Sequence, residues 1–183
     1  MNYTYQYPMQ TVTADAVVFC RHEVLLIKRN TEPFKGQWAL PGGHLDPEDE
    51  NTEVTADREL KEETGVDADD QNVFIQGEVG AYSQIDRDPR GRYITIAYFY
   101  CMLEKPECKI DPEEVKEVKW FNIYDLKEDE VAFDHYKIIM DADVKATKIM
   151  LSAPTSINST IKKWGNILGK DLGVKCVVKD YEK

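Results

Sequence analysis

Residues 41–66 read PGGHLDPEDENTEVTADRELKEETGV, and the rest of the chain is organised around this stretch. It opens with a Gly-Gly pair, which we expect to form a turn, and it continues as a loop rich in acidic residues. Asn51 or Thr52 can cap the start of a helix, because their side-chain oxygens accept hydrogen bonds from free backbone N–H groups. Gly65 can end that helix in the left-handed conformation, which glycine adopts at low cost.

Three glutamates of this predicted helix share one face. Glu59, Glu62 and Glu63 stand at positions i, i+3 and i+4, which are neighbours on a helix surface. Like charges at this spacing repel by about 0.2–0.5 kcal/mol per pair, so a bound cation would stabilise them. Magnesium takes oxygen ligands and commonly bridges to substrate phosphates. In this setting the spacing favours a metal and phosphate site over its alternative, a solvated acidic face.

The stretch resembles the Nudix box, whose pattern is G-x5-E-x7-R-E-U-x-E-E-x-G-U with U an aliphatic residue. Glu50 stands at the required distance before Arg58, and the resemblance implies that these side chains pair and hold the helix against the loop. The sequence has one residue more between Gly43 and Glu50 than the pattern allows. We therefore expect an insertion within residues 44–49, in a loop where length changes are tolerated. The matching positions are Arg58, Glu59, Leu60, Glu62, Glu63, Gly65 and Val66.

The resemblance implies an α/β fold, the Nudix-type α/β/α sandwich around a mixed β-sheet. It also implies a divalent cation, Mg²⁺ or Mn²⁺ in its place. Glu59 and Glu63 would hold the metal directly, Glu62 would hold it directly or through water, and the Gly42 carbonyl would join them.

The rest of the chain supplies the strands of such a sheet. Runs of β-branched and apolar residues predict strands at 11–20, 24–28, 38–40, 72–82, 93–103 and 115–122. A short helical turn is expected at 123–126, and helical periodicity extends over 133–152. We expect two side chains of the central helix to face the core, and four of the late helix to share one side. These are Val54 and Leu60, and Tyr136, Ile139, Met140 and Val144.

The chain divides into a Nudix hydrolase domain at residues 1–150 and a C-terminal extension at residues 151–183. The extension carries a predicted short helix at 163–168 and a predicted strand at 174–178. It holds the most basic stretch of the chain, but it is too short for a winged helix of ordinary size. Its role is open, with a structural addition or a dimer contact favoured.

Composition narrows the class of protein. The 183 residues carry a formal net charge of −11 with a pI near 4.8, which argues against a nucleic-acid-binding surface. No apolar run is long enough for a membrane span, and the N-terminus lacks the features of a secretion signal. Four scattered cysteines form no C-x-x-C pair, so we expect a reduced, cytoplasmic protein. They are Cys20, Cys101, Cys108 and Cys176.

Residues 86–92 read DRDPRGR and predict the substrate side of the site. The planar forks of Arg87, Arg90 and Arg92 suit phosphate or ribose recognition, although such a run is usually an exposed turn. This run resembles the ADP-ribose pyrophosphatase branch of the Nudix family, as do residues 32–43 and 133–135. The resemblance covers roughly residues 8 to 150.

Aromatic and histidine side chains are weaker candidates. Phe34, Trp38 and Tyr82 could stack on an adenine, although such residues more often anchor a core or a loop. His44 and His135 are expected to be structural, since bound metal already supplies the activation.

The chemistry that fits is hydrolysis of a nucleoside diphosphate linked to another group. A carboxylate would accept a proton from the water that attacks phosphorus. The candidates for catalytic carboxylates are Glu59 and Glu63 in the box and Glu114 in the loop before the last strand, with Glu113 a weaker alternative. Glu113 and Glu114 could equally be solvated loop acids.

The sequence supports three hypotheses for function. The leading one is a Mg²⁺-dependent Nudix pyrophosphohydrolase that splits ADP-ribose into AMP and ribose 5-phosphate. A second keeps the chemistry but takes a dNTP, an NAD-type dinucleotide or a nucleotide sugar. A third is a regulatory protein that senses ADP-ribose without catalysis. A small-molecule nucleotide is the expected partner, with no membrane or nucleic acid, and relatives commonly form homodimers.

Overall fold

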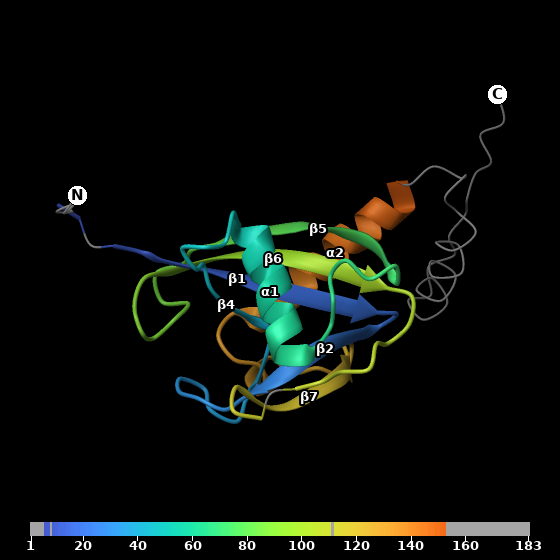
Figure 1. Cartoon of the computed structure of the whole chain (residues 1–183), viewed down its shortest axis with the longest axis horizontal. Coiled ribbons are helices and arrows are strands. Elements are labelled where there is room, and N and C mark those ends of the chain that lie inside the picture. Colours follow the sequence, from blue (N-terminus) through green and yellow to red (C-terminus); the bar gives the residue numbers. More distant parts are fainter. Residues whose placement is uncertain (1–5, 8, 111, 153–183) are drawn as a thin grey trace.

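The computed structural model of the chain describes residues 6–7, 9–110 and 112–152. These residues form seven strands, two α-helices and one short 3₁₀ helix (Figure 1). In chain order the elements are β1 (Thr11–Cys20), β2 (Glu23–Arg29), β3 (Trp38–Ala39), β4 (Gly42–His44), α1 (Thr52–Thr64), β5 (Val73–Tyr82), β6 (Tyr93–Met102), β7 (Val115–Asn122), η1 (Glu128–Glu130) and α2 (His135–Ser152).

The strands form one mixed sheet in the order β3-β2-β1-β6-β5, with β4 paired to β1 and β7 paired to β2. β1 and β6 are parallel and stay in register from the pair Thr11–Tyr93 to the pair Cys20–Met102. The other strand pairs are antiparallel. Because β1 and β6 are neighbours and run in the same direction, their first residues lie side by side at the same end of the strands.

The two α-helices cover opposite faces of the sheet, α1 in front and α2 behind in Figure 1. β1 contributes side chains to the cores on both faces of the sheet, since successive residues of a strand point to opposite faces. Val17 and Phe19 join the core on the α2 side, whereas Ala16 and Val18 join the core on the α1 side. The predicted α/β/α sandwich around a mixed sheet is confirmed.

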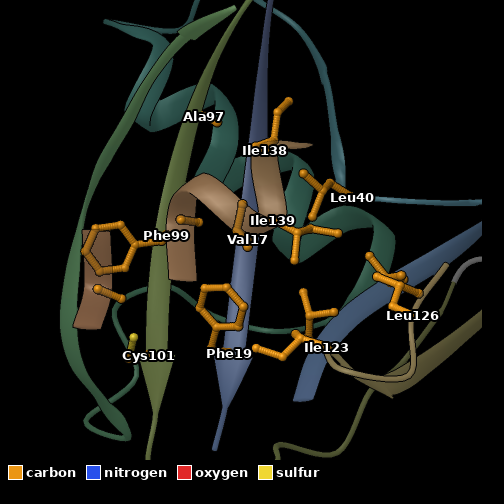
Figure 2. Packing of buried hydrophobic residues seen from close by; sticks show 14 of the residues in the cluster. Val17, Phe19, Leu40, Ala97, Phe99, Cys101, Ile123, Leu126, Ile138 and Ile139 are labelled. Carbon is orange, nitrogen blue, oxygen red and sulfur yellow. The ribbon is translucent and has the colours of Figure 1, made fainter. Parts of the chain in front are cut away.

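The core on the α2 side is built from large apolar side chains of the sheet and of the helix (Figure 2). Phe99 of β6 and Ile138 and Ile139 of α2 are fully buried. Burial of one such side chain contributes about 1.5–3 kcal/mol, so this layer is a main source of stability. Leu40 belongs to the same cluster and anchors the chain just before β4.

Both predicted caps of α1 are present. The Asn51 side chain accepts hydrogen bonds from the backbone N–H groups of Glu53 and Val54 at 2.9 and 3.1 Å. Gly65 has φ 73° and donates its N–H to the Lys61 carbonyl at 2.9 Å. These ends fix the register of the helix, and with it the face on which its glutamates lie.

We expected the Gly-Gly pair to form a turn, and this is wrong. The pair is the start of β4, which pairs with β1. A Cβ atom on Gly42 would collide with the Ala14 carbonyl and with Asp15. Glycine is needed here because the two strands approach closely at this point.

Three further expectations about side chains and turns are wrong. Val54 is 39% exposed, although Leu60 is buried as expected. Residues 123–126 form a non-helical turn, and the 3₁₀ helix η1 comes later. Val144 is 51% exposed, because the buried face of α2 lies along Ile138, Ile139, Ala142 and Ala146.

The predicted elements at 163–168 and 174–178 lie outside the described residues. Neither described α-helix combines the length and the apolar character that crossing a bilayer requires. Cys20, Cys101 and Cys108 are free thiols.

Candidate active site

An open cleft with a volume of about 200 Å³ lies where β1 and β6 begin. Thr13 and Asp15 of β1 and Tyr93 of β6 contribute to its floor. Gly42 and Glu63 border the cleft on the side of the Nudix-like box. Arg29, Arg87 and Arg90 also line the cleft; we call these arginines the cationic wall, and we call Asp15 and Glu63 the acidic floor.

Glu63 is the central carboxylate of the acidic floor. It accepts a hydrogen bond from the backbone N–H of Gly42 at 2.9 Å. Burial of this carboxylate raises its pKa to about 8, although the Gly42 hydrogen bond acts in the opposite direction. The negative charges of Glu59, Asp15 and Glu114 raise the pKa further. Within the described residues, no cationic side chain forms an ion pair with Glu63.

Glu59 lies beside β4 on the same helix face. A Cβ atom on Gly43 would collide with the Glu59 carboxylate, so glycine is what lets the helix approach the strand. Burial raises the pKa of Glu59, although Arg58 donates to its carboxylate at 2.9 Å and acts in the opposite direction. Glu62, in contrast, is half exposed and bonds Arg58 at 3.0 Å.

These residues have the chemistry that a hard divalent cation requires. Glu59 and Glu63 are oxygen donors whose charge is costly without a cation, as their raised pKa values indicate. In the described part of the chain, no three acidic, histidine or cysteine side chains already converge on one point. At present Glu59 accepts a hydrogen bond from Arg58, and Glu63 accepts one from the Gly42 N–H.

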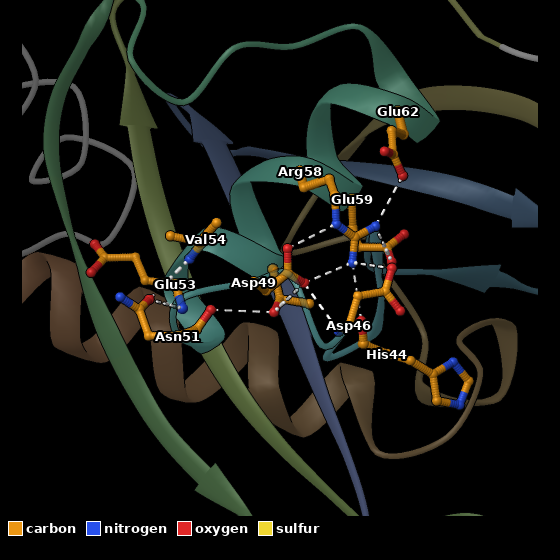
Figure 3. Close-up of polar contacts among 10 residues, drawn as sticks. His44, Asp46, Asp49, Asn51, Glu53, Val54, Arg58, Glu59 and Glu62 are labelled. Carbon is orange, nitrogen blue, oxygen red and sulfur yellow. Dashed lines mark hydrogen bonds and ion pairs between the residues drawn. The ribbon is translucent and has the colours of Figure 1, made fainter.

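Arg58 joins the helix to the preceding loop (Figure 3). Its guanidinium binds both oxygens of Asp49, with Nε at 3.2 Å and Nη2 at 3.0 Å, and Nη2 also donates to the His44 carbonyl at 3.0 Å. These bonds lower the pKa of Asp49 to about 2. Asp49 also accepts a hydrogen bond from the Thr55 hydroxyl at 2.9 Å, which ties it to α1.

The expected pair between Arg58 and Glu50 is therefore wrong, and Glu50 is exposed. Asp49 stands six positions after Gly43, as the acidic residue of the pattern G-x5-E does. The extra residue thus falls between Asp49 and Arg58 rather than between Gly43 and the acid. An aspartate in place of the glutamate keeps the two-pronged contact with the arginine.

Two of the three predicted arginines line the cleft, and each is bound to an aspartate. Arg87 is buried and donates to both oxygens of Asp134, at 3.0 and 2.7 Å. Arg90 donates to both oxygens of Asp88, at 3.0 and 2.7 Å. Arg92 is exposed and does not line the cleft.

A third arginine of the wall, Arg29, does not belong to the predicted run of residues 86–92. It is the last residue of β2 and lines the cleft. Its Nε donates to the Pro33 carbonyl at 2.8 Å, and its guanidinium lies 4.9 Å from the centre of the Phe133 ring. The available signal was the basic pair Lys28 and Arg29 directly after the buried apolar residues 24–27.

The predicted stacking residues do not line the cleft. Trp38 packs edge-on against Phe121 at 4.6 Å, and Phe34 packs against Phe133 at 4.8 Å. Tyr82 donates to Asp141 of α2 at 2.9 Å.

Two other aromatic rings do line the cleft, those of Tyr93 and Phe133. The guanidinium of Arg90 lies 4.5 Å from the centre of the Tyr93 ring. These two rings, together with Leu40, contribute apolar surface to the cleft.

His135 connects the floor of the cleft to the segment before β4. Its Nδ1 accepts a hydrogen bond from the backbone N–H of Leu40 at 2.9 Å. Burial lowers the pKa of His135 to about 3, so the ring is neutral and can accept this bond. Its Nε2 lies 3.8 Å from buried Asp15, which accepts a hydrogen bond from the Thr95 hydroxyl at 2.5 Å. These contacts support the structural role expected for His135.

The outer candidates lie at the rim. Glu113 and Glu114 are exposed on the turn before β7 and do not line the cleft, although the charge of Glu114 reaches Glu63. His44 is exposed, and its ring lies 5.9 Å from that of Tyr93.

Comparison with known proteins agrees with this geometry. An ADP-ribose pyrophosphatase from Methanocaldococcus jannaschii is 38% identical over 130 residues, which cover 71% of this chain and 71% of that protein. The ADPR responsive transcriptional repressor NtrR from Acinetobacter baylyi is 33% identical over 142 residues, which cover 74% of this chain and 54% of the repressor. The chain thus spans about half the length of that second relative.

A solved structure supports the same relation. The NUDIX domain of Shewanella oneidensis NrtR, complexed with ADP ribose, has a TM-score of 0.70 and 34% identity, over 79% of this chain and 94% of that domain. The family model described as the NUDIX domain matches residues 9–142, which is well over half of the chain. The chain therefore belongs to the NUDIX domain family and resembles its ADP-ribose pyrophosphatases.

Proposed function

We propose that this protein hydrolyses ADP-ribose to AMP and ribose 5-phosphate in the presence of Mg²⁺, for which Mn²⁺ can substitute. One observation carries the proposal: a single cleft joins an acidic floor at Glu63 to a wall of arginines and aromatic rings. The relative named as an ADP-ribose pyrophosphatase and the related domain complexed with ADP ribose support this choice of substrate.

The two sides of the cleft suit the two needs of such a substrate. A diphosphate carries negative charge, which the protein as a whole, at −11, would repel. Arg29, which forms no ion pair within the described residues, reduces this repulsion locally, and the rings of Tyr93 and Phe133, over which arginine guanidiniums lie, line the cleft beside it.

Glu59, Glu62, Glu63 and the Gly42 carbonyl would hold the metal, which supplies neutralisation of the diphosphate and activation of water. The water oxygen forms a bond to phosphorus, and the bridging P–O bond breaks with its electron pair leaving on the departing phosphate. A carboxylate of this chain accepts the proton of the water. Glu59, Glu63 and Glu114 are the candidates for that acceptor, and Glu63 lies in the cleft with a pKa of about 8.

A second candidate function is sensing of ADP-ribose without hydrolysis. It is favoured by the likeness to the ADPR responsive repressor NtrR and to the NrtR domain that holds ADP ribose. The three box carboxylates are all present in this chain, which favours hydrolysis over sensing. Hydrolysis of a dNTP, an NAD-type dinucleotide or a nucleotide sugar keeps the same catalytic groups and differs only at the wall.

A substrate panel with purified full-length protein and Mg²⁺ separates these functions. We expect AMP release from ADP-ribose at a higher kcat/KM than from NADH, dNTPs or diadenosine polyphosphates. A preference for another substrate would refute the choice of ADP-ribose and leave the chemistry standing. Tight ADP-ribose binding without AMP release, together with a shift of DNA at physiological salt, would establish the sensor.

We further propose that the protein acts in the cytoplasm, as a homodimer and without nucleic acid. The free thiols of Cys20, Cys101 and Cys108 and the net charge of −11 support a reducing compartment and the lack of a nucleic-acid partner. Light scattering of the purified protein measures the oligomeric state, and a monomeric mass would refute the dimer.

A further inference from the structure

Beside its buried face, α2 carries a second stripe that is mostly apolar. Positions 140, 144, 147 and 151 stand at i, i+4, i+7 and i+11, so they lie in one line along the helix. Val144 is 51% exposed and Leu151 is 67% exposed, whereas the first residue of the line is partly buried against the core. The α2 stripe consists of Met140, Val144, Thr147 and Leu151.

A small hollow adjoins the α2 stripe where β1 and β6 end. Phe19 and Cys101 of the sheet and Ala146 and Met150 of α2 line it with apolar atoms. Thr147 lines the hollow too, so the hollow and the stripe are continuous. Figure 1 shows α2 ending on the side toward which the arrows of β1 and β6 point. The cleft of the candidate active site lies where these strands begin, so the two surfaces are separate.

An exposed apolar stripe that adjoins a hollow is typical of an interaction site. The nearest segment that could cover it belongs to the same chain. α2 ends at Ser152, one residue after the last position of the stripe, and residues 153–183 continue from there. The C-terminal extension is therefore tethered beside the stripe.

The sequence of residues 157–168 repeats the spacing of the stripe. Apolar residues stand there at i, i+4, i+7 and i+11, a pattern that predicts a helix with one apolar face and that includes the helix predicted at 163–168. These residues are Ile157, Ile161, Trp164 and Leu168. A helix this short is marginal by itself in water, and Gly165 weakens it further. Packing of its apolar face on another apolar surface would stabilise it.

The connection and the charge both favour this contact. Residues 153–156 join the two segments and include Pro154, which interrupts a helix. Connections of about two to eight residues are usual between packed antiparallel helices. The extension holds six lysines and three acidic residues, a net charge of +3 in a chain of −11, so residues 1–152 carry −14. The extension is thus attracted to the rest of the protein.

We propose that residues 157–168 dock on the α2 stripe and its hollow, antiparallel to α2 and within the same chain. A hairpin centred on Pro154 places Ile157 opposite Leu151 and Trp164 opposite Val144. The contact gives the C-terminal extension a structural role, because it covers the apolar surface that α2 exposes. It lies away from the cleft, so it does not depend on which substrate the cleft binds.

Limited digestion of the full-length protein with trypsin tests the contact. Trypsin cleaves where the chain opens locally, and two of its sites lie in the proposed segment, after Lys162 and Lys163. We expect the double variant Val144→Gln/Leu151→Gln to speed cleavage at these sites about fivefold or more, since it removes the apolar partner of the segment. Mass spectrometry measures the rate at each site. Equal rates in the wild type and the double variant would overturn the proposal.

Lys145→Gln is the matched control. Lys145 is exposed on the side of α2 that faces β5, where its Nζ donates to the Val79 carbonyl at 3.3 Å. This variant should leave the cleavage rates within about twofold of the wild type. If circular dichroism shows that the double variant does not fold, the single variants Val144→Gln and Ile157→Ser decide. Faster cleavage in both supports docking, and unchanged cleavage in either refutes it.

Protein concentration separates docking within one chain from contact with a second copy. We expect the cleavage rates of the wild type to be the same in dilute and concentrated solution, because the segment and the stripe belong to one chain. Slower cleavage at higher concentration, together with a dimeric mass that the double variant loses, would place a second copy on the stripe and overturn the proposal.

Discussion

The acidic floor and the cationic wall of the cleft share one feature with opposite charges: most charged side chains form ion pairs within the protein, and one does not. In the floor, Arg58 is occupied by Asp49, Glu59 and Glu62, and Glu63 forms no ion pair in the described part of the chain. In the wall, the aspartates are occupied by Arg87 and Arg90, whereas Arg29 forms no ion pair within the described residues and feels the charges of Glu63, Asp88 and Asp15 from a greater distance. Whether a charged side chain supports the structure or is available to a ligand thus depends on its ion-pair partners more than on its residue type.

The strongest way to break this symmetry is to remove the unpaired carboxylate. Glu63→Gln should lower kcat for ADP-ribose by about 10²–10⁴-fold while the protein stays folded, because the amide cannot hold a metal or accept a proton as the carboxylate does. Steady-state kinetics with Mg²⁺ and circular dichroism measure the two properties. Glu53→Gln, on an exposed position of the same helix, is the control. Near-normal kcat in Glu63→Gln would overturn the metal assignment.

The unpaired carboxylate also predicts how stability depends on pH. The pKa of Glu63 is about 8 in the folded protein and near 4.5 when unfolded, so between these values the native state keeps a proton that the unfolded state has lost. Without metal, the free energy of unfolding should therefore fall as pH rises from 6 to 8, by roughly 1–3 kcal/mol relative to Glu63→Gln. The window starts at pH 6 because the pKa of Asp15 lies there.

Urea titrations in EDTA at several pH values measure this difference. Added Mg²⁺ should restore the stability of the wild type at pH 8 and have a smaller effect on Glu63→Gln, since a ligand stabilises only the state that binds it. Parallel pH curves for the two proteins would refute a raised pKa at Glu63.

The scaffold arginine should matter for stability more than for binding. Arg58→Met removes the hydrogen bonds that tie the loop to α1 and should lower the free energy of unfolding by about 1–3 kcal/mol. Lys61→Met is the control, because it removes an exposed ion pair between the same helix and Asp67. Its urea midpoint should equal that of the wild type. Equal urea midpoints for the two variants would show that the hydrogen bonds of Arg58 to the loop do not stabilise the fold.

The smallest effect distinguishes the two neighbouring acids of the loop. Asp49→Asn should weaken the contact with Arg58 and lower kcat/KM several-fold, since α1 and β4 lose their common anchor. Glu50→Gln should leave kcat/KM unchanged, because this side chain is exposed. The opposite order of effects would restore Glu50 as the partner of Arg58.

The sequence predicted the sheet and the helix register well, because both follow from local patterns. Apolar runs marked the long strands, and Asn51 and Gly65 marked the ends of α1. The acidic partner of Arg58 was predicted wrongly as Glu50, because the spacing of the box pattern was taken from Arg58 toward the N-terminus. Counting forward from Gly43 gives Asp49, and the pairing of β4 with β1 makes that glycine the fixed reference.

The cationic wall could not be predicted in the same way. The pair between Arg87 and Asp134 joins residues 47 positions apart, so the sequence does not show that this arginine is already occupied. Arg29 ends β2 after the apolar residues 24–27 and Lys28, and the strand pairing shifts register beside it, at a partner strand far away in the sequence. Contacts of this kind arise from tertiary packing alone.

The parallel pairing of β1 and β6 has a consequence for how such a protein can diversify. The loop of residues 83–92 carries part of the cationic wall into β6, whereas β1, β4 and α1 carry the acidic floor. Substitutions and insertions in that loop can alter which molecules fit without disturbing the register of the sheet or the glutamates of α1. The choice of ligand can therefore change in this architecture while the acidic residues of the floor stay the same.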